Sequence, residues 1–267
     1  PSNISACLSS LFNLYGVNYS ISAACATSAH CIGHAFELIQ SGKQDIIFAG
    51  GGEEISCELA CQFDAMKVLS THFNYNPTKS SRVYDINRDG FVISGGGGIL
   101  VLEDLNCALS RSARIYGEII SYANNSDGLN MFVPSEEGII RCMYLACKEK
   151  NISIDYINVH STSTQIGDLI ELNAIKKVFL NSKKPIISAT KSISGHSLGV
   201  AGVHEMIYTL LMIKNEFIAP SINIDILDPH AKNMNILTHV VHKKIIVAMS
   251  NSFGFGGTNV SLIVKKY

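Results

Sequence analysis

The sequence predicts an α/β fold built from two similar layered units, and three observations support this prediction. Short apolar segments that suit buried strands alternate with longer segments whose apolar residues recur at helical spacing. Glycine occurs 21 times and proline only 6 times, and glycine-rich segments separate the predicted strands. Hydrophobic residues make up 47% of the 267 residues and charged residues 16%, so most of the chain is expected to form buried core.

The first predicted elements are a helix and a strand. Residues 22–40 predict a helix, because small residues occupy its start and Ile32 and Ile39 fall on one face. Residues 45–49 form a short apolar run that predicts a buried strand, followed by a loop of three glycines. Residues 91–102 predict a strand, a glycine turn and a second strand.

The second part of the chain repeats this alternation. The predicted strands are 154–159, 186–189, 244–249 and 260–264, and the predicted helices are 168–179 and 199–213. A glycine-rich turn at 251–259 joins the last two strands, as in the segment 91–102. This similarity indicates a duplicated α/β unit, with predicted domains at 1–112 and 113–267.

The charge balance and the apolar runs exclude several classes of protein. Lys and Arg total 21 and Asp and Glu total 22, so the basic excess typical of nucleic-acid binding is missing. The apolar runs fall short of the roughly 18 residues that a membrane span needs, and no secretory signal is visible. The sequence begins with Pro1, which suggests a processed chain or a fragment.

The cysteines and histidines offer the first candidate site. Eight cysteines without a C-x-x-C pair favour free thiols in a reducing, cytoplasmic setting. Cys25 lies at the start of a predicted helix, where the helix dipole and unpaired N–H groups lower the pKa of a thiol; a buried core thiol is the alternative. His160 and His196 each follow a predicted strand, where α/β folds usually bind ligands, and Lys191 lies close to His196.

Two other patterns indicate different chemistry. Gly195-His-Ser-Leu-Gly199 matches G-x-S-x-G, the nucleophile elbow of α/β-hydrolases and some acyltransferases, with Ser197 as the nucleophile. His30 and His34 have the i, i+4 spacing of a zinc site, although no third ligand is evident. The glycine clusters match neither of the two phosphate-binding loop patterns.

Four ordered segments resemble the signatures of the β-ketoacyl-acyl carrier protein synthases of the thiolase-like superfamily. They are 22–33, 160–168, 190–199 and 251–259. Three more segments look closest to synthase I, the elongating bacterial enzyme: 48–54, 63–66 and 88–93. The resemblance covers the whole chain. It implies a thiolase-like duplicated layered α/β fold whose N-terminal half is incomplete.

The resemblance implies an acyltransferase of fatty acid biosynthesis and lipid metabolism. Cys25 would accept an acyl chain from acyl carrier protein, and the backbone N–H groups of Cys25 and Phe255 would hold the oxyanion. His160 and His196 would stabilise the enolate formed as malonyl-acyl carrier protein loses CO2, serving decarboxylation more than acylation. The product is a 3-ketoacyl chain two carbons longer.

The resemblance also implies supporting roles for other residues. Lys191 would give electrostatic support with Glu171 as its partner. The remaining assignments are pantetheine contacts (Thr162, Thr164), acyl-pocket or gating aromatics (Phe63, Phe91, Phe255) and a possible monovalent cation site (Asn158, Glu205, Ser250, Asn251). Family members usually carry Gly after the first histidine, and Ser161 here is expected to constrain the pantetheine entrance.

The expected partners are acyl- and malonyl-loaded acyl carrier protein and a second copy of the chain in a homodimer. No cofactor is expected, because the carrier protein brings the phosphopantetheine, and neither nucleic acid nor membrane is an expected partner. The arginines at 82, 88, 111 and 114 are scattered and form no dense basic patch for the acidic carrier.

The isolated 267 residues are expected to be an inactive fragment. Competing hypotheses are a hydrolase that uses Ser197 and an inactive, non-enzymatic partner.

Overall fold

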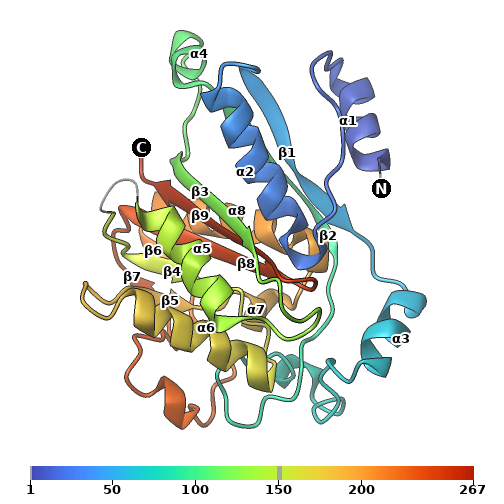
Figure 1. Ribbon diagram of the computed structural model, residues 1–267, viewed down its shortest axis with the longest axis vertical. Coiled ribbons are helices and arrows are strands. Elements are labelled where there is room, and N and C mark those ends of the chain that lie inside the picture. The colour runs from blue at the N-terminus through green and yellow to red at the C-terminus, as the bar shows by residue number, and fades with distance from the viewer. Residues whose placement is uncertain (1, 149–151) are drawn as a thin grey trace.

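A five-stranded mixed sheet forms the centre of the fold in the computed structural model, which describes residues 2–148 and 152–267 (Figure 1). The strands lie in the order β3 (Glu118–Ser126), β9 (Thr258–Lys265), β8 (Val247–Gly254), β4 (Tyr156–Asn158) and β5 (Ile186–Ser188). β4 pairs in parallel with β5 and β8, whereas β9 pairs antiparallel with β8 and β3. Leu262 and Ile263 on β9 belong to different core clusters, so both faces of the sheet are buried.

Helices cover both faces of this sheet. On one face lie α5 (Glu136–Lys148) and α6 (Gln165–Val178), whose Met143 and Leu172 join the first core cluster (Figure 1). On the other face lie α2 (Thr27–Gln40) and α8 (Ala201–Asn215), whose Ile32 and Met206 join the second cluster. The alternation of helix and strand layers confirms the predicted α/β class.

A two-stranded antiparallel sheet, β1 (Ile46–Glu53) with β2 (Gly96–Glu103), lies against α2 and α8. The predicted loop after residue 49 and the predicted glycine turn at 91–102 are both wrong, because these glycines are in paired strands. A Cβ at Gly50 would collide with the carbonyl of Gly98 on the facing strand. Glycine therefore serves close approach of two backbones here, not a reversal of the chain.

The second predicted strand–turn–strand segment is a true hairpin. β8 and β9 pair from Val247↔Lys265 to Gly254↔Thr258, and the turn between them contains Phe255. Gly256 and Gly257 have φ angles of 88° and 74°, which glycine adopts without strain. Since the first segment is not a hairpin, the repeated pattern no longer supports the predicted domain boundary, which stays a prediction.

The remaining elements connect these layers. They are the helices α1 (Asn3–Phe12), α3 (Cys57–Ala65), α4 (Leu105–Ser110) and α7 (Lys191–Ser194), the short strands β6 (Phe217–Ile218) and β7 (Val241–His242), and the 3-10 turns η1 (Ala24–Ala26), η2 (Pro77–Lys79), η3 (Leu198–Val200) and η4 (Pro229–Ala231). Among the described residues, no helix is both long and apolar enough to cross a membrane.

Candidate active site

Cys25 lies in the 3-10 turn η1 that leads into α2, so the predicted helix begins a few residues later than expected. Ala24 has a φ of 45°, a conformation that is unfavourable for a residue with a side chain. Thr27 supports this turn: its Oγ1 accepts the Ala23 N–H at 2.8 Å, and its hydroxyl donates to the Ala24 carbonyl at 2.7 Å. The turn therefore holds the Cys25 thiol at the start of the helix axis.

Cys25 is only 8% exposed, and this burial determines the ionisation of its thiol. It raises the pKa of the Cys25 thiol to about 11, although the charge of Lys191 and the backbone N–H groups of Phe255 and Cys25 act in the opposite direction. The expectation that the helix start lowers this pKa is therefore wrong. The thiol keeps its proton at neutral pH and needs a base during acyl transfer.

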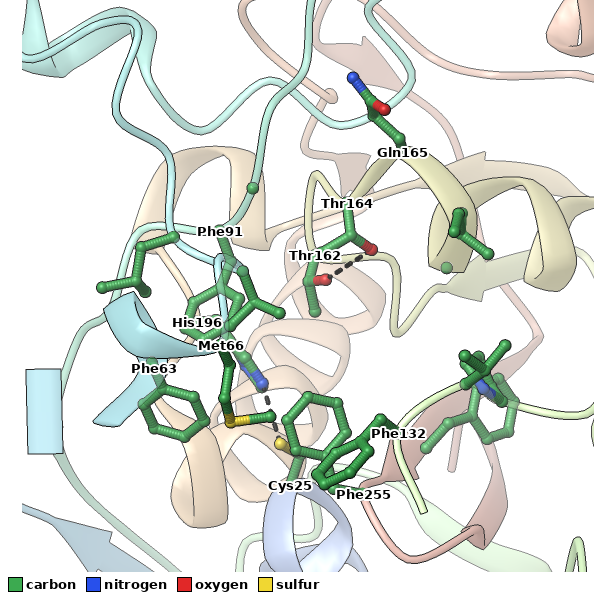
Figure 2. A pocket seen from close by; sticks show the side chains of 18 of the residues that line it. Cys25, Phe63, Met66, Phe91, Phe132, Thr162, Thr164, Gln165, His196 and Phe255 are labelled. Atoms are coloured by element: carbon green, nitrogen blue, oxygen red, sulfur yellow. Dashed lines mark hydrogen bonds between the residues drawn. The ribbon is translucent and has the colours of Figure 1, made fainter. Parts of the chain in front are cut away.

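His196 is in contact with the thiol. Its Nε2 lies 3.1 Å from Cys25 Sγ (Figure 2). The His196 N–H donates to the Val92 carbonyl at 2.8 Å, and the ring of Phe91 packs edge-on at 5.3 Å, so backbone and ring are both held. Burial keeps the pKa of His196 well below its ordinary value, which leaves a neutral imidazole. His196 is therefore placed to take the proton from Cys25.

His160 lies beside His196 at the end of β4. The two ring centroids are 5.4 Å apart and the rings are nearly perpendicular; the Phe253 ring lies 5.8 Å from His160 on another side. Burial also keeps the pKa of His160 well below its ordinary value. Two uncharged imidazoles thus converge next to one thiol, as the sequence resemblance implies.

Two buried carboxylates of α6 hold the loop that carries His160. Glu171 accepts the backbone N–H groups of His160 at 3.0 Å and Ser161 at 2.7 Å. Asp168, one turn earlier, accepts the N–H groups of residues 162–163 at 3.0 and 3.1 Å. Four consecutive N–H groups therefore end on one helix face, and this fixes the loop relative to the sheet.

Lys191 pairs with Glu205, not with the predicted Glu171. Both side chains are buried at 2% relative exposure, and Lys191 Nζ forms an ion pair and hydrogen bond with Glu205 Oε1. Burial raises the pKa of Glu205 to about 7, and the Lys191 charge opposes this rise. The pairing was missed because it depends on how α8 packs against α7, which local sequence does not specify.

Replacing Glu205 by Ala is expected to destabilise the full-length protein by about 3 kcal/mol or more, because Lys191 would stay buried without its partner. Urea denaturation at 25 °C measures this change. Glu137→Ala is the matched control, since it breaks an exposed pair with Arg141 (3.1 Å) on one helix and should cost far less. Equal, small changes for both variants would contradict the burial argument.

The thiol and both imidazoles line one cavity of about 850 Å³, within the range of small-molecule sites. The other sequence-predicted residues on its wall are Phe63, Phe91, Ser161, Thr162, Thr164, Glu171 and Phe255. In Figure 2, the aromatic side chains gather near Cys25, whereas Thr162 and Thr164 lie farther along with their hydroxyls 3.4 Å apart. The predicted Lys191 is not on this wall.

Aromatic rings pack against one another beside Cys25. Phe63 lies edge-on to Phe91 at 5.3 Å and 6.5 Å from Phe255, while Phe132 lies edge-on to Phe255 at 5.9 Å. Phe63, Phe91 and Phe255 therefore share the place that the resemblance implies for acyl-pocket residues. Phe132 was not predicted, because its loop carries no signature motif.

A second cavity of about 840 Å³ lies on the other side of the same wall. Both cavities are lined by Cys25, Phe63 and Phe255, and the second one extends along α1, residues 13–22 and β1. Two cavities that meet at a thiol allow a substrate to enter from one side and a chain to extend into the other.

Ser197, the rival nucleophile, is buried at 4% exposure and lines neither cavity. Its Oγ lies 3.0 Å from Nδ1 of His204, whose Nε2 lies 3.3 Å from the Gly97 carbonyl. This pair links α8 to β2, so its hydrogen bonds have a packing role. A substrate in either of these two cavities does not contact Ser197.

The four scattered arginines do not form a basic surface. Arg82 and Arg88 are buried at 3% and 2% exposure; Arg82 pairs with Asp85 and Asp225, and Arg88 pairs with Asp168 and Asp228. Arg111 forms a bidentate pair with Glu103, and Arg114 lies over the ring of Tyr116. Arg82 and Arg88 thus fix loops near the cavity.

Among the proposed cation ligands, Glu205 supplies a buried carboxylate oxygen, Oε2, that has no hydrogen-bond partner among the described residues. The amide oxygens of Asn158 and Asn251 already accept hydrogen bonds from Thr190 at 3.1 Å and Ser261 at 2.9 Å. In the described part of the chain, no cluster of three His, Cys, Asp or Glu residues suits a metal, which also leaves the zinc hypothesis for His30 without support.

Sequence reasoning missed Asp168, Arg88 and Tyr84 as parts of the site. Asp168 and Glu171 are three residues apart on a predicted helix, which places them on one face, and two acidic residues on a buried helix face are uncommon. That spacing from the predicted Glu171 was the signal that could have found Asp168. Tyr84 gave no signal, since its role depends on a contact with Ser161 (3.0 Å) 77 residues away.

The comparisons with known proteins agree along the chain. The profile of the β-ketoacyl synthase N-terminal domain matches residues 1–108, and that of the C-terminal domain matches residues 116–225. The 3-oxoacyl-[acyl-carrier-protein] synthase 1 of Buchnera aphidicola subsp. Schizaphis graminum is 73% identical over 267 residues, which are 100% of this chain and 66% of that protein. The Escherichia coli K12 protein of the same name is 58% identical over 265 residues, 99% of this chain and 65% of that one.

Solved structures give the same result. The structure described as a type II PKS acyl-carrier protein in complex with its ketosynthase bound to the hexaketide has a TM-score of 0.95 and 31% identity, covering 100% of this chain and 67% of that one. A β-ketoacyl synthase from Burkholderia phymatum also has a TM-score of 0.95, with 35% identity and coverage of 100% and 66%. Two domain profiles in sequence and a fold match over the whole chain lead to one conclusion: the chain belongs to the β-ketoacyl synthase family.

Proposed function

We propose that the protein containing this chain catalyses the decarboxylating condensation of an acyl chain on Cys25 with malonyl-acyl carrier protein in fatty acid elongation. The main support is the contact of the Cys25 thiol with the His196 imidazole, beside His160, in a cavity large enough for a thioester arm. The chain spans about two thirds of the length of the curated relatives it matches, which are named 3-oxoacyl-[acyl-carrier-protein] synthase 1.

In the first step, the Cys25 sulfur attacks the thioester carbonyl of acyl-acyl carrier protein. His196 Nε2 accepts the thiol proton and returns it to the leaving carrier thiolate, so the step is balanced. The backbone N–H groups of Cys25 and Phe255, which already act on the sulfur, support the oxyanion of the tetrahedral intermediate. The acyl chain extends along the aromatic wall.

In the second step, malonyl-acyl carrier protein enters the cavity and loses CO2. Between the two steps, tautomer exchange through solvent returns a proton to His196 Nε2. His160 and His196 then donate hydrogen bonds to the thioester oxygen, where negative charge develops as the enolate forms. The enolate carbon attacks the acyl carbonyl on Cys25, and the Cys25 thiolate that leaves takes up one proton from water. The products are CO2 and a 3-ketoacyl chain two carbons longer on the carrier.

Residues farther from the sulfur have supporting roles in this proposal. Thr162 and Thr164 line the cavity away from Cys25 and offer hydroxyls to the pantetheine arm. The positive charge of Lys191 acts on Cys25, His160 and His196. The proposed reaction uses no cofactor. A monovalent cation, where bound, would contact Glu205 Oε2, the carboxylate oxygen that does not bond to Lys191.

We also propose acyl carrier protein as the macromolecular partner, in the cytoplasm. The solved ketosynthase complex with its acyl-carrier protein and the near-whole-chain fold match support this choice of partner. The eight cysteines, all free in the structure, fit a reducing setting.

The isolated 267-residue chain is expected to self-associate and to show negligible condensation. Large apolar side chains around the second cavity are exposed, including Tyr15 at 93%, Val17 at 56% and Tyr19 at 50%, and β1 has one paired edge among the described strands. The proposed homodimer would cover this surface. Sedimentation velocity and a condensation assay test the expectation; a soluble, active monomer would contradict it.

The direct test of the function is an assay with acyl- and malonyl-loaded acyl carrier protein and the full-length protein. Stoichiometric release of CO2 with a 3-ketoacyl product supports condensation. Release of free fatty acid without CO2 would support the hydrolase alternative, and no reaction at all would support the inactive-partner alternative.

A further inference from the structure

The Ser161 side chain joins two buried groups that the proposed mechanism does not use directly. Ser161 is 2% exposed, and its hydroxyl donates to Glu171 Oε2 at 2.8 Å. The Tyr84 hydroxyl lies 3.0 Å from the same Ser161 oxygen. Since the Ser161 hydrogen goes to Glu171, the Tyr84 hydroxyl is the donor in this second bond.

These contacts direct the Ser161 hydroxyl toward α6 and the core, where Tyr84 is fully buried. Ser161 also lines the first cavity, so the expectation that it constrains the pantetheine entrance stays a prediction beside this role. The φ of Ser161 is not positive, so the residue also creates no backbone strain. Its effect must come from the hydroxyl.

Glu171 is the group through which that hydroxyl acts. Its carboxylate accepts four hydrogen bonds: the N–H of His160 (3.0 Å), the N–H (2.7 Å) and hydroxyl (2.8 Å) of Ser161, and the amide of Asn251 (3.2 Å). Among the described residues, no Lys, Arg or His forms an ion pair with it. A buried carboxylate without a paired cation depends on such donors for its position.

His160 depends on Glu171 for its own position. Its Nδ1 is buried and has no hydrogen-bond partner among the described residues. The ring is therefore held by packing against His196 and Phe253, and by the backbone N–H bond to Glu171. A shift of the Glu171 carboxylate would move the His160 backbone and with it the ring.

We propose that Ser161 is a positioning residue for His160: its hydroxyl ties the Glu171 carboxylate to Tyr84 and thereby fixes the loop that aims the imidazole. This inference rests on the proposed function, because it assigns Ser161 to the decarboxylation step that uses His160. Acylation of Cys25 does not depend on the Ser161 hydroxyl, since the contact between Cys25 and His196 involves other elements.

The test measures two steps separately in the full-length protein. Ser161→Ala should lower kcat for CO2 release from malonyl-acyl carrier protein about tenfold, with little change in KM and an unchanged rate of Cys25 acylation. The matched control is Ser188→Ala, which removes another buried Ser–Tyr contact (Ser188 to Tyr156, 2.9 Å) away from both cavities. A merely structural role predicts similar losses in both variants, which would overturn the proposal.

A further variant, Ser161→Gly, adds a comparison of decarboxylation rates that a loss of stability alone would not explain. Ser161→Gly leaves a space in which a water can donate to Glu171, whereas the alanine methyl occupies the space and donates nothing. We expect Ser161→Gly to retain more decarboxylation than Ser161→Ala, although glycine is the more flexible residue. An equal or lower rate for glycine would overturn the proposal.

His160→Ala in the same assay separates the inference from the proposed function. Slow CO2 release in His160→Ala with a normal rate in Ser161→Ala would refute the role of Ser161 alone. Normal release in His160→Ala would refute the proposed role of His160 itself, and with it the basis of this inference.

Discussion

Cys25→Ala is expected to lower the condensation rate of the full-length protein by at least about 10³-fold, because Cys25 is the one nucleophile among the described residues that lines both cavities. The rate of 3-ketoacyl product formation from acyl- and malonyl-acyl carrier protein measures this effect. The thiol is buried but opens to two cavities, and its removal takes away the atom that must carry the acyl group.

Ser197→Ala is the control for that variant. Ser197 contacts His204 and lines neither cavity, so the condensation rate should change less than about tenfold. A large loss in Ser197→Ala together with a small loss in Cys25→Ala would reverse the assignment and favour the G-x-S-x-G reading.

Replacing the two histidines is expected to give different patterns. His160→Ala should lower CO2 release by about 10²–10³-fold and leave acylation of Cys25 nearly unchanged, because His160 supports the enolate oxygen and does not contact the sulfur. His196→Ala should slow both steps, since His196 Nε2 lies 3.1 Å from Cys25 Sγ and the pKa of that thiol is raised to about 11. Single-turnover assays with labelled acyl and malonyl groups resolve the two steps.

This pattern revises the sequence-based hypothesis that both histidines serve decarboxylation more than acylation. That hypothesis assumed a thiol ionised by the helix dipole, whereas burial raises the pKa of Cys25 above its ordinary value here. Rapid acylation in His196→Ala at neutral pH would mean that the thiol ionises without its neighbour and would restore the earlier hypothesis.

The sequence predicted the layers of the fold well where side chains carry the signal. Apolar runs located β4, β5 and β8 to within a few residues, and small residues marked the start of α2. Glycine carried no such signal. The same residue type makes the β8–β9 turn, where φ is positive, and the β1–β2 pairing, where backbones approach closely. Sequence alone does not distinguish these two uses.

The candidate site was predictable where short motifs carry the residues. Cys25, His160 and His196 each lie in a signature segment, and the structure brings all three to one cavity. The partner of Lys191 was not predictable, because Glu171 and Glu205 lie on different helices and only their packing decides which one reaches the ammonium.

Burial was the second property that local sequence could not give. Arg82 and Arg88 look like surface charges in the sequence, yet both are enclosed by carboxylates and position loops. The pKa of Cys25 follows the same rule, since the desolvation of a thiol depends on every element packed around it.

The location of the acyl group during turnover tests the central claim most directly. The full-length protein is incubated with acyl-acyl carrier protein alone, digested and mapped by mass spectrometry; malonyl-acyl carrier protein is then added to a second sample. We expect the acyl mass on the Cys25 peptide in the first sample and its loss in the second, matched by CO2 and 3-ketoacyl product. An acyl group on Ser197, or an unmodified Cys25 in a protein that still turns over, would contradict the account.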